Sequence, residues 1–267
     1  MKLSMPCNDC LQGRAPETWP RLAERPRLVG EILDGGVVHS RCEQDHAVTF
    51  FLNEPAFELT FELSALALLD GYYRESVLGF TTALERLYVF AAKFIAARRG
   101  LPTDVFALAW KKINRAERQL GAFLALYALE MTEPCDLKSI DRFTELRNHV
   151  AHEGLIPPRD QVLEYGAAAL DFIHRTLREL LGTELSEAQE RGIALAFQIA
   201  VEERKTREAP PPGARVAHLA RFETMVGLKT PFAWREGAFL DRLERLRLQR
   251  PELYATELEA ADEKPKE

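Results

Sequence analysis

The stretch Tyr73-RESVLGFTTALERLYVFAAKFIAAR-Arg99 predicts a long helix and decides the fold class of this chain. Its apolar residues recur at spacings of three and four, which places them on one face of the helix: Tyr73, Val77, Phe80, Leu84, Leu87, Ala91 and Phe94. Gly100 and Pro102 end the helix, after two arginines that suit the negative end of its dipole. A single apolar face needs helical partners, so the stretch predicts a bundle.

Similar patterns predict further helices on both sides of this stretch. They are expected at residues 55–70, 103–130, 139–153, 159–181 and 186–205, with shorter helical pieces near 215–226 and 238–248. The expected fold class is therefore mainly α.

Composition is that of an ordinary globular protein, with 46% hydrophobic and 28% charged residues among 267. No apolar run reaches the roughly 20 residues that span a bilayer, so we expect no membrane partner. The start, MKLSMPCNDC, lacks the apolar core of an export signal, and we expect a cytoplasmic protein. The formal net charge of -6 argues against broad nonspecific coating of nucleic acid.

Two short motifs near the N-terminus carry soft metal ligands. Cys7 and Cys10 form a CxxC pair, and Cys42 and His46 are separated by three residues. Two turns with two ligands each suit tetrahedral zinc, and four protein ligands would leave no open position, as in structural sites. His39 is an alternative fourth ligand, and the other interpretation is incidental reduced cysteines. The fourth cysteine, Cys135, is expected to be a core or loop thiol.

The chain divides into three predicted zones. Residues 1–53 form a zinc-ribbon-like segment of loops and short strands, with β-branched or aromatic runs at 36–39 and 47–52. Residues 54–182 form the helical domain. Residues 183–267 form a C-terminal helical extension with a proline-rich linker near 209–213 and a disordered tail from residue 260.

Arg147, Asn148 and His152 form a dense polar cluster in the helix expected at residues 139–153. At about 100° per residue they share one polar arc, while Phe143, Leu146 and Val150 point into the bundle and His149 lies further round. An arginine fork fits phosphate oxygens, and a histidine can act as a general base near neutral pH. The alternative is structural: a histidine that caps carbonyls and a solvated arginine.

Arg147-Asn148-x-x-x-His152 resembles the R-N-x-x-x-H motif of HEPN domains, an α-helical superfamily that contains many ribonucleases. The long helix pair between residues 57 and 99, with its segments Leu69-Asp-Gly-Tyr-Tyr-Arg-Glu-Ser and Ala83-Leu-Glu-Arg-Leu-Tyr88, also looks like that family. The similarity covers about residues 54–182.

This resemblance implies a metal-independent endoribonuclease. His152 would deprotonate a ribose 2′-hydroxyl, Arg147 would hold the phosphate, Asn148 would position either group, and a cyclic phosphate would remain. It also implies a homodimer, RNA as the partner, and a toxin or defence role with a neutralising partner protein. The alternative within the family is a noncatalytic module that binds protein or nucleic acid and uses the zinc ribbon for contacts.

A basic stripe gives further support. Lys111, Arg115 and Arg118, with Lys112 beside them, are spaced to lie on one face of the helix expected at 103–130, where they could follow an RNA backbone. A solvated helix face is the alternative. Residues 68–87 also resemble one tetratricopeptide-type hairpin, but no second copy follows. No HExxH or phosphate-loop pattern supports a conventional metalloenzyme.

Overall fold

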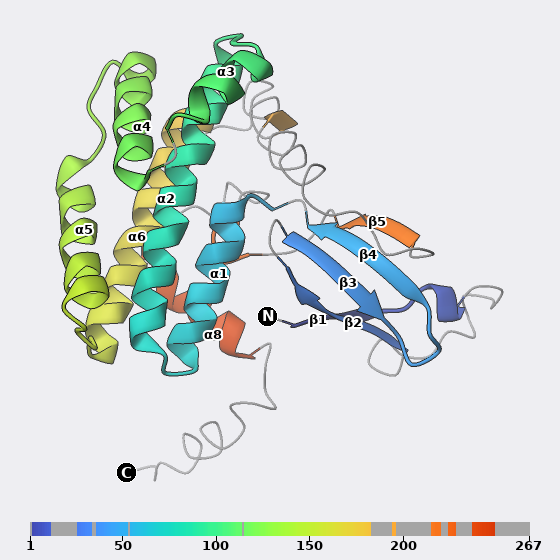
Figure 1. Ribbon diagram of the computed structural model, residues 1–267. Helices are drawn as coiled ribbons and strands as arrows, with labels where there is room; N and C mark the ends of the chain where they lie inside the picture. Colours follow the sequence, from blue (N-terminus) through green and yellow to red (C-terminus); the bar gives the residue numbers. More distant parts are fainter. Residues whose placement is uncertain are drawn as a thin grey trace, which may run out of the picture.

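A helical bundle stands beside a small β-sheet in this protein (Figure 1). The computed structural model describes residues 2–11, 26–33, 36–52, 54–113, 115–182, 194–195, 215–219, 224–227 and 237–248. The prediction of a mainly helical chain with a helical bundle is confirmed. The expected helices at 55–70, 139–153, 159–181 and 238–248 are present within two residues at each end.

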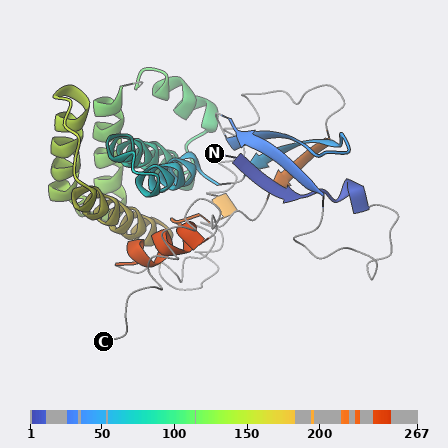
Figure 2. The ribbon, with the colours of Figure 1, turned by 90° about the horizontal axis from the view of Figure 1, so that it is seen from below.

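The bundle is built around α2, which packs mainly against α1, α4, α5 and α6. Its helices are α1 (Ala56–Leu69), α2 (Tyr73–Arg98), α3 (Thr103–Trp110), α4 (Ala116–Met131), α5 (Leu137–His152), α6 (Arg159–Leu181) and α8 (Phe239–Leu248). Figure 2 shows α8 against the side of the bundle, where it contacts α1 and α6. The apolar stripe read from the sequence of α2 is therefore covered from several directions.

Aromatic rings fill the core between these helices. The ring centroids of Phe61 and Phe80 lie 4.7 Å apart, and those of Tyr88 and Phe123 are stacked at 5.0 Å. Such pairs add to the stability that burial of apolar area already provides. Gly166 of α6 allows a close approach, because a Cβ there would meet the Phe239 ring at 2.6 Å.

The sheet has five strands in the order β1-β2-β3-β4-β5. The strands are β1 (Lys2–Pro6), β2 (Arg27–Ile32), β3 (Val37–Arg41), β4 (Ala47–Leu52) and β5 (Arg215–Leu219), and η1 (Asp9–Leu11) is a short 3-10 helix after β1. Pairing is antiparallel from β1 to β4, whereas β5 pairs with β4 in parallel. The sheet has its own small apolar cluster, which Leu59 of α1 joins.

A buried polar contact ties the C-terminal part of the chain to α1. Thr224 donates to Glu58 at 2.6 Å, and the backbone N–H of Met225 donates to Glu62 at 2.9 Å. Both carboxylates are buried. Arg242 of α8 donates to the carbonyls of Met225 and Val226. Burial raises the pKa of Glu62 to about 7, although the N–H of Met225 opposes this rise.

The single helix expected at residues 103–130 is wrong, because α3 and α4 are separate helices. Arg115 has an extended backbone and begins α4. The side chains of Arg118 and Gln119 donate to the carbonyls of Lys112 and Ile113. Side chains thus occupy carbonyls that a continuous helix would use internally.

The helical piece expected near 215–226 is also wrong. Residues 215–219 form strand β5, which pairs along β4 with Phe50 opposite Ala217. Arg215 also forms an ion pair with Asp9 at 3.0 Å. The unpaired edge of β4 offers a row of hydrogen-bonding groups, and this tertiary partner overrides a weak local helix preference. The helix expected at 186–205 lies almost wholly outside the described residues, and the linker at 209–213 and the tail from 260 lie wholly outside them.

Candidate functional site

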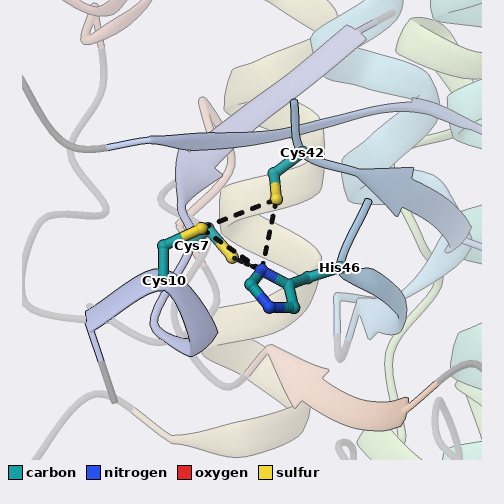
Figure 3. Close-up of side chains that lie close together, drawn as sticks. All are labelled: Cys7, Cys10, Cys42 and His46. Atoms are coloured by element: carbon teal, nitrogen blue, oxygen red, sulfur yellow. Dashed lines mark hydrogen bonds between the residues drawn. The ribbon is translucent and has the colours of Figure 1, made fainter. Parts of the chain in front are cut away.

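The four predicted metal ligands come together at one end of the sheet (Figure 3). Cys7 follows β1 and Cys10 lies in η1, while Cys42 follows β3 and His46 precedes β4. The β3–β4 connection is a tight turn in which the Cys42 N–H donates to the His46 carbonyl at 3.2 Å. Antiparallel pairing therefore brings both ligand pairs to the same place.

The spacing of the ligand atoms fits a metal ion. All four atoms lie within 4.8 Å of one another. His46 Nδ1 lies 3.7, 3.2 and 3.5 Å from the sulfurs of Cys7, Cys10 and Cys42, and the sulfurs of Cys10 and Cys42 are 3.6 Å apart. Tetrahedral zinc with ordinary bond lengths gives edges of roughly 3.5–3.8 Å. These residues could hold a metal ion such as zinc.

The thiols differ in how readily they ionise. Burial, together with hydrogen bonds to the other two thiols, raises the pKa of Cys10 to about 12. Burial also opposes ionisation of Cys42, but backbone N–H groups of His46 and Gln44 lower its pKa to about 7. The turn that positions Cys42 thus also favours its thiolate, which is the form that binds metal.

His39 is not part of this cluster. Its Nδ1 lies 3.0 Å from the hydroxyl of Thr49 on the neighbouring strand. His46, and not His39, is the fourth member. Cys135 lies elsewhere, buried in the core of the bundle, as a core thiol.

The second candidate site is the end of α5. Nη1 of Arg147 donates to Oδ1 of Asn148 at 3.0 Å and lies 3.2 Å from Nε2 of His152. Arg147 and Asn148 are half-buried, and His152 is exposed. Arginine only donates hydrogen bonds, so Nε2 of His152 is the acceptor of this contact. The three residues grouped by the helical wheel are in contact.

Val150 and Phe143 are buried on the opposite side of α5, as the wheel predicts, and Leu146 is partly buried. His149 belongs neither to this buried face nor to the cluster of Arg147, Asn148 and His152. Its Nδ1 lies 2.8 Å from a carboxylate oxygen of Glu153, and this contact raises the pKa of His149. It is therefore a useful control for His152.

Comparison with protein-family models, with curated proteins and with solved structures finds no match for this chain.

One acidic residue near Arg147 was not among the predicted site residues. Glu85 of α2 lies half-buried, within electrostatic range of Arg147 and of Glu117 on α4. Burial raises its pKa, and Arg147 works against that rise. The sequence contains little signal for it, because Glu85 and Arg86 both lie between Leu84 and Leu87 and neither is on the face of the apolar stripe.

The predicted RNA-binding cations do not form one stripe. Lys111 and Lys112 follow α3, Arg115 directly precedes α4 and Arg118 lies in its first turn. All four are exposed. They gather around the α3–α4 connection because the chain turns there.

None of the helices in the described part of the chain combines the length and apolar character that crossing a membrane requires.

Proposed function

We propose that this chain is a metal-independent endoribonuclease of the HEPN type with its catalytic site at the end of α5. The observation that carries the proposal is the pair of contacts from Arg147 to Asn148 and His152. A cation, an amide and an imidazole are held together where one of them is exposed to solvent. This combination suits a phosphodiester better than it suits a structural helix end.

The proposed reaction uses each of these groups. When Nη1 of Arg147 moves from His152 to the phosphate, Nε2 of His152 is free to accept the proton of the ribose 2′-hydroxyl, and the 2′-oxygen forms a bond to the adjacent phosphorus. The bond from phosphorus to the 5′-oxygen breaks, and that oxygen takes a proton from water. The products are a 2′,3′-cyclic phosphate and a 5′-hydroxyl.

Arg147 stabilises the charge that develops on the phosphate. Both of its contacts in the free protein use Nη1, so neither requires Nε–H or the Nη2 protons. These donors form a fork that matches two phosphate oxygens. Asn148 fixes the position of the guanidinium. The carboxyl group of Glu85, on α2, lies within electrostatic range of this guanidinium.

Zinc bound by Cys7, Cys10, Cys42 and His46 would be structural in this proposal. Four protein ligands complete a tetrahedron and leave no position for substrate or water. The ion would crosslink β1, η1 and the β3–β4 turn, in a sheet whose own apolar cluster is small. The chemistry belongs to α5.

A homodimer is part of the proposal. Leu155 and Ile156 follow directly after α5 and are 38% and 74% exposed. Apolar side chains next to His152 suit a face that pairs with a second copy and brings two clusters to one cleft.

The test compares two histidines of the same helix turn. Purified protein should cleave labelled single-stranded RNA in EDTA and leave a 2′,3′-cyclic phosphate, with its metal content checked afterwards. His152→Ala should abolish cleavage, whereas His149→Ala should retain it. Absence of cleavage by the unaltered protein over a broad set of RNAs would instead favour a noncatalytic binding module.

A further inference from the structure

Helix α3 presents apolar side chains to solvent instead of burying them. None of its eight residues is buried. Val105 is 49% exposed and Leu108 is 70% exposed. The rings of Phe106 and Trp110 are stacked with centroids 4.9 Å apart, and both are only half-buried. Exposed aromatic and aliphatic groups on one short helix mark an interaction surface.

Cations follow directly after these rings. Lys111, Lys112, Arg115 and Arg118 are exposed, and Glu117 is the one acidic residue between positions 111 and 118. Four positive charges and one negative give +3 for this segment, in a chain whose net charge is -6. Arg118 also donates to the carbonyl of Lys112 at 3.2 Å, which fixes the segment against α4.

We propose that this surface binds single-stranded RNA, with unpaired bases on the Phe106–Trp110 pair and the backbone along the four cations. The inference rests on the proposed function and extends it to the form of the substrate. The local positive charge complements a polyanion, and aromatic rings stack on any exposed base. An RNA duplex does not suit this surface, because its bases are already stacked on one another and its deep major groove excludes side chains.

The surface and α5, the helix that carries the candidate catalytic site, lie on either side of α4 (Figures 1 and 2). Glu117, in the first turn of α4, is within electrostatic range of Glu85, which is within range of Arg147.

The binding test uses full-length His152→Ala protein, so that the RNA stays intact. Fluorescence anisotropy with labelled 12-nucleotide oligouridylate, oligoadenylate and a 12-base-pair RNA duplex gives Kd over a range of salt. Trp110→Ala should weaken binding of both single strands by about tenfold, since stacking is worth about 1–3 kcal/mol per base. Tyr72→Ala is the matched control, because Tyr72 is an aromatic residue 62% exposed at the start of α2. It should leave Kd unchanged.

A second variant tests the cations without touching the rings. Lys111→Ala/Lys112→Ala changes two exposed side chains, so folding is preserved. The slope of log Kd against log salt should fall by about 1.4, or about 0.7 for each phosphate that a lysine no longer neutralises. Lys138→Ala, at an exposed lysine of α5, should not change the slope.

Three results would overturn the inference. They are equal Kd values for Trp110→Ala and Tyr72→Ala, duplex binding as tight as single-strand binding, and a change in oligomeric mass for Trp110→Ala with unchanged RNA binding. The last result would identify α3 as a self-association surface. RNA cleavage is measured separately on protein with His152 intact. Cleavage without an effect of Trp110 leaves the proposed function standing, whereas binding without cleavage removes the proposed function alone.

Discussion

The two polar clusters of this molecule differ in how many of their polar atoms contact other members of the same cluster. In the sheet, the four ligand atoms lie within 4.8 Å of one another, and they belong to Cys7, Cys10, Cys42 and His46. At the end of α5, Arg147 contacts Asn148 and His152 through a single nitrogen, and His152 is exposed. The first cluster is closed and the second is open.

This difference suits the first cluster to a structural role and the second cluster to a catalytic role. A closed set of four soft ligands is complete once it holds an ion, so its effect is on folding. An open set with unused donors has capacity for a molecule that arrives from solvent. Substitutions in the first cluster should therefore change stability, and substitutions in the second should change activity.

The largest expected effect is loss of the ion from the sheet. Cys42→Ser removes a ligand, and structural zinc contributes about 10–16 kcal/mol of binding free energy in small domains. Bound metal should fall to background by mass spectrometry, and the amides of β3 and β4 should lose protection from hydrogen exchange while those of α2 keep it. Cys135→Ser, at the core thiol, is the control and should retain metal. Unchanged metal content in Cys42→Ser would remove the metal site.

The next effect should appear in activity alone. Arg147→Lys keeps the charge but replaces the fork by one ammonium group, so a single group can no longer serve Asn148, His152 and phosphate. Cleavage should fall by about 10²–10³-fold, as for loss of a transition-state donor, with no change in Tm. The control is Arg142→Lys, an exposed residue of α5 that pairs with Glu164 at 3.5 Å. Equal cleavage by Arg147→Lys and Arg142→Lys would contradict a catalytic role for the cluster at the end of α5.

Glu62 shows a third situation, a buried acid held by a backbone N–H. It accepts the Met225 N–H at 2.9 Å, next to Glu58, while Arg242 binds carbonyls of the same segment. Burial raises its pKa from 4.5 to about 7. Between these values the folded state keeps a proton that the unfolded state has lost, so stability falls as pH rises from about 4.5 to about 7.

Glu62→Gln keeps an oxygen for the Met225 N–H and removes the titration. Above pH 7 the variant should be more stable than the unaltered protein, by at most about 3 kcal/mol. Urea unfolding at pH 4.5, 6 and 8 measures the difference. Glu75→Gln, at an exposed glutamate of α2, should behave like the unaltered protein. If the free energy of unfolding of Glu62→Gln still falls as pH rises over this range, a group other than Glu62 causes the fall.

The sequence predicted most strongly those parts that depend on local periodicity. The stripe of α2, the bounds of α6 and the contact group Arg147, Asn148 and His152 all follow from spacing along one helix. The two pairs of metal ligands, Cys7 with Cys10 and Cys42 with His46, also follow, because each pair lies within one turn. In all these cases the deciding information lies within a few residues.

The missed features depend on distant partners. Strand β5 exists because β4 offers an open edge about 165 residues earlier in the chain, as the register of Thr49 with Val216 shows. Glu85 comes within electrostatic range of Arg147 only after α2 and α5 have packed together. The break between α3 and α4 depends on side chains of Arg118 and Gln119 that take over backbone carbonyls. Spacing within one element contains none of this information.

The smallest expected effect concerns the start of α5, the helix that carries the open cluster. Asp136 accepts from the backbone N–H of Ser139 at 3.1 Å and from its hydroxyl at 2.7 Å, and it pairs with Arg175 at 2.9 Å. The hydroxyl of Ser139 is the main cause that lowers the pKa of Asp136 below 3.8, so this stabilisation is present at neutral pH and is lost as pH falls below that value.

Asp136→Ala should lower the free energy of unfolding by about 1 kcal/mol, as for other helix caps, measured by urea unfolding at pH 7. Asp136→Asn keeps the cap oxygen and should lose less. RNA cleavage should change little in either variant, because residues 136 and 147 are three helical turns apart and the contacts of Arg147 lie within the last turns of α5. Loss of cleavage in Asp136→Ala as large as that in Arg147→Lys would mean that the cluster depends on the whole helix, and the open site would then be no more self-contained than the closed one.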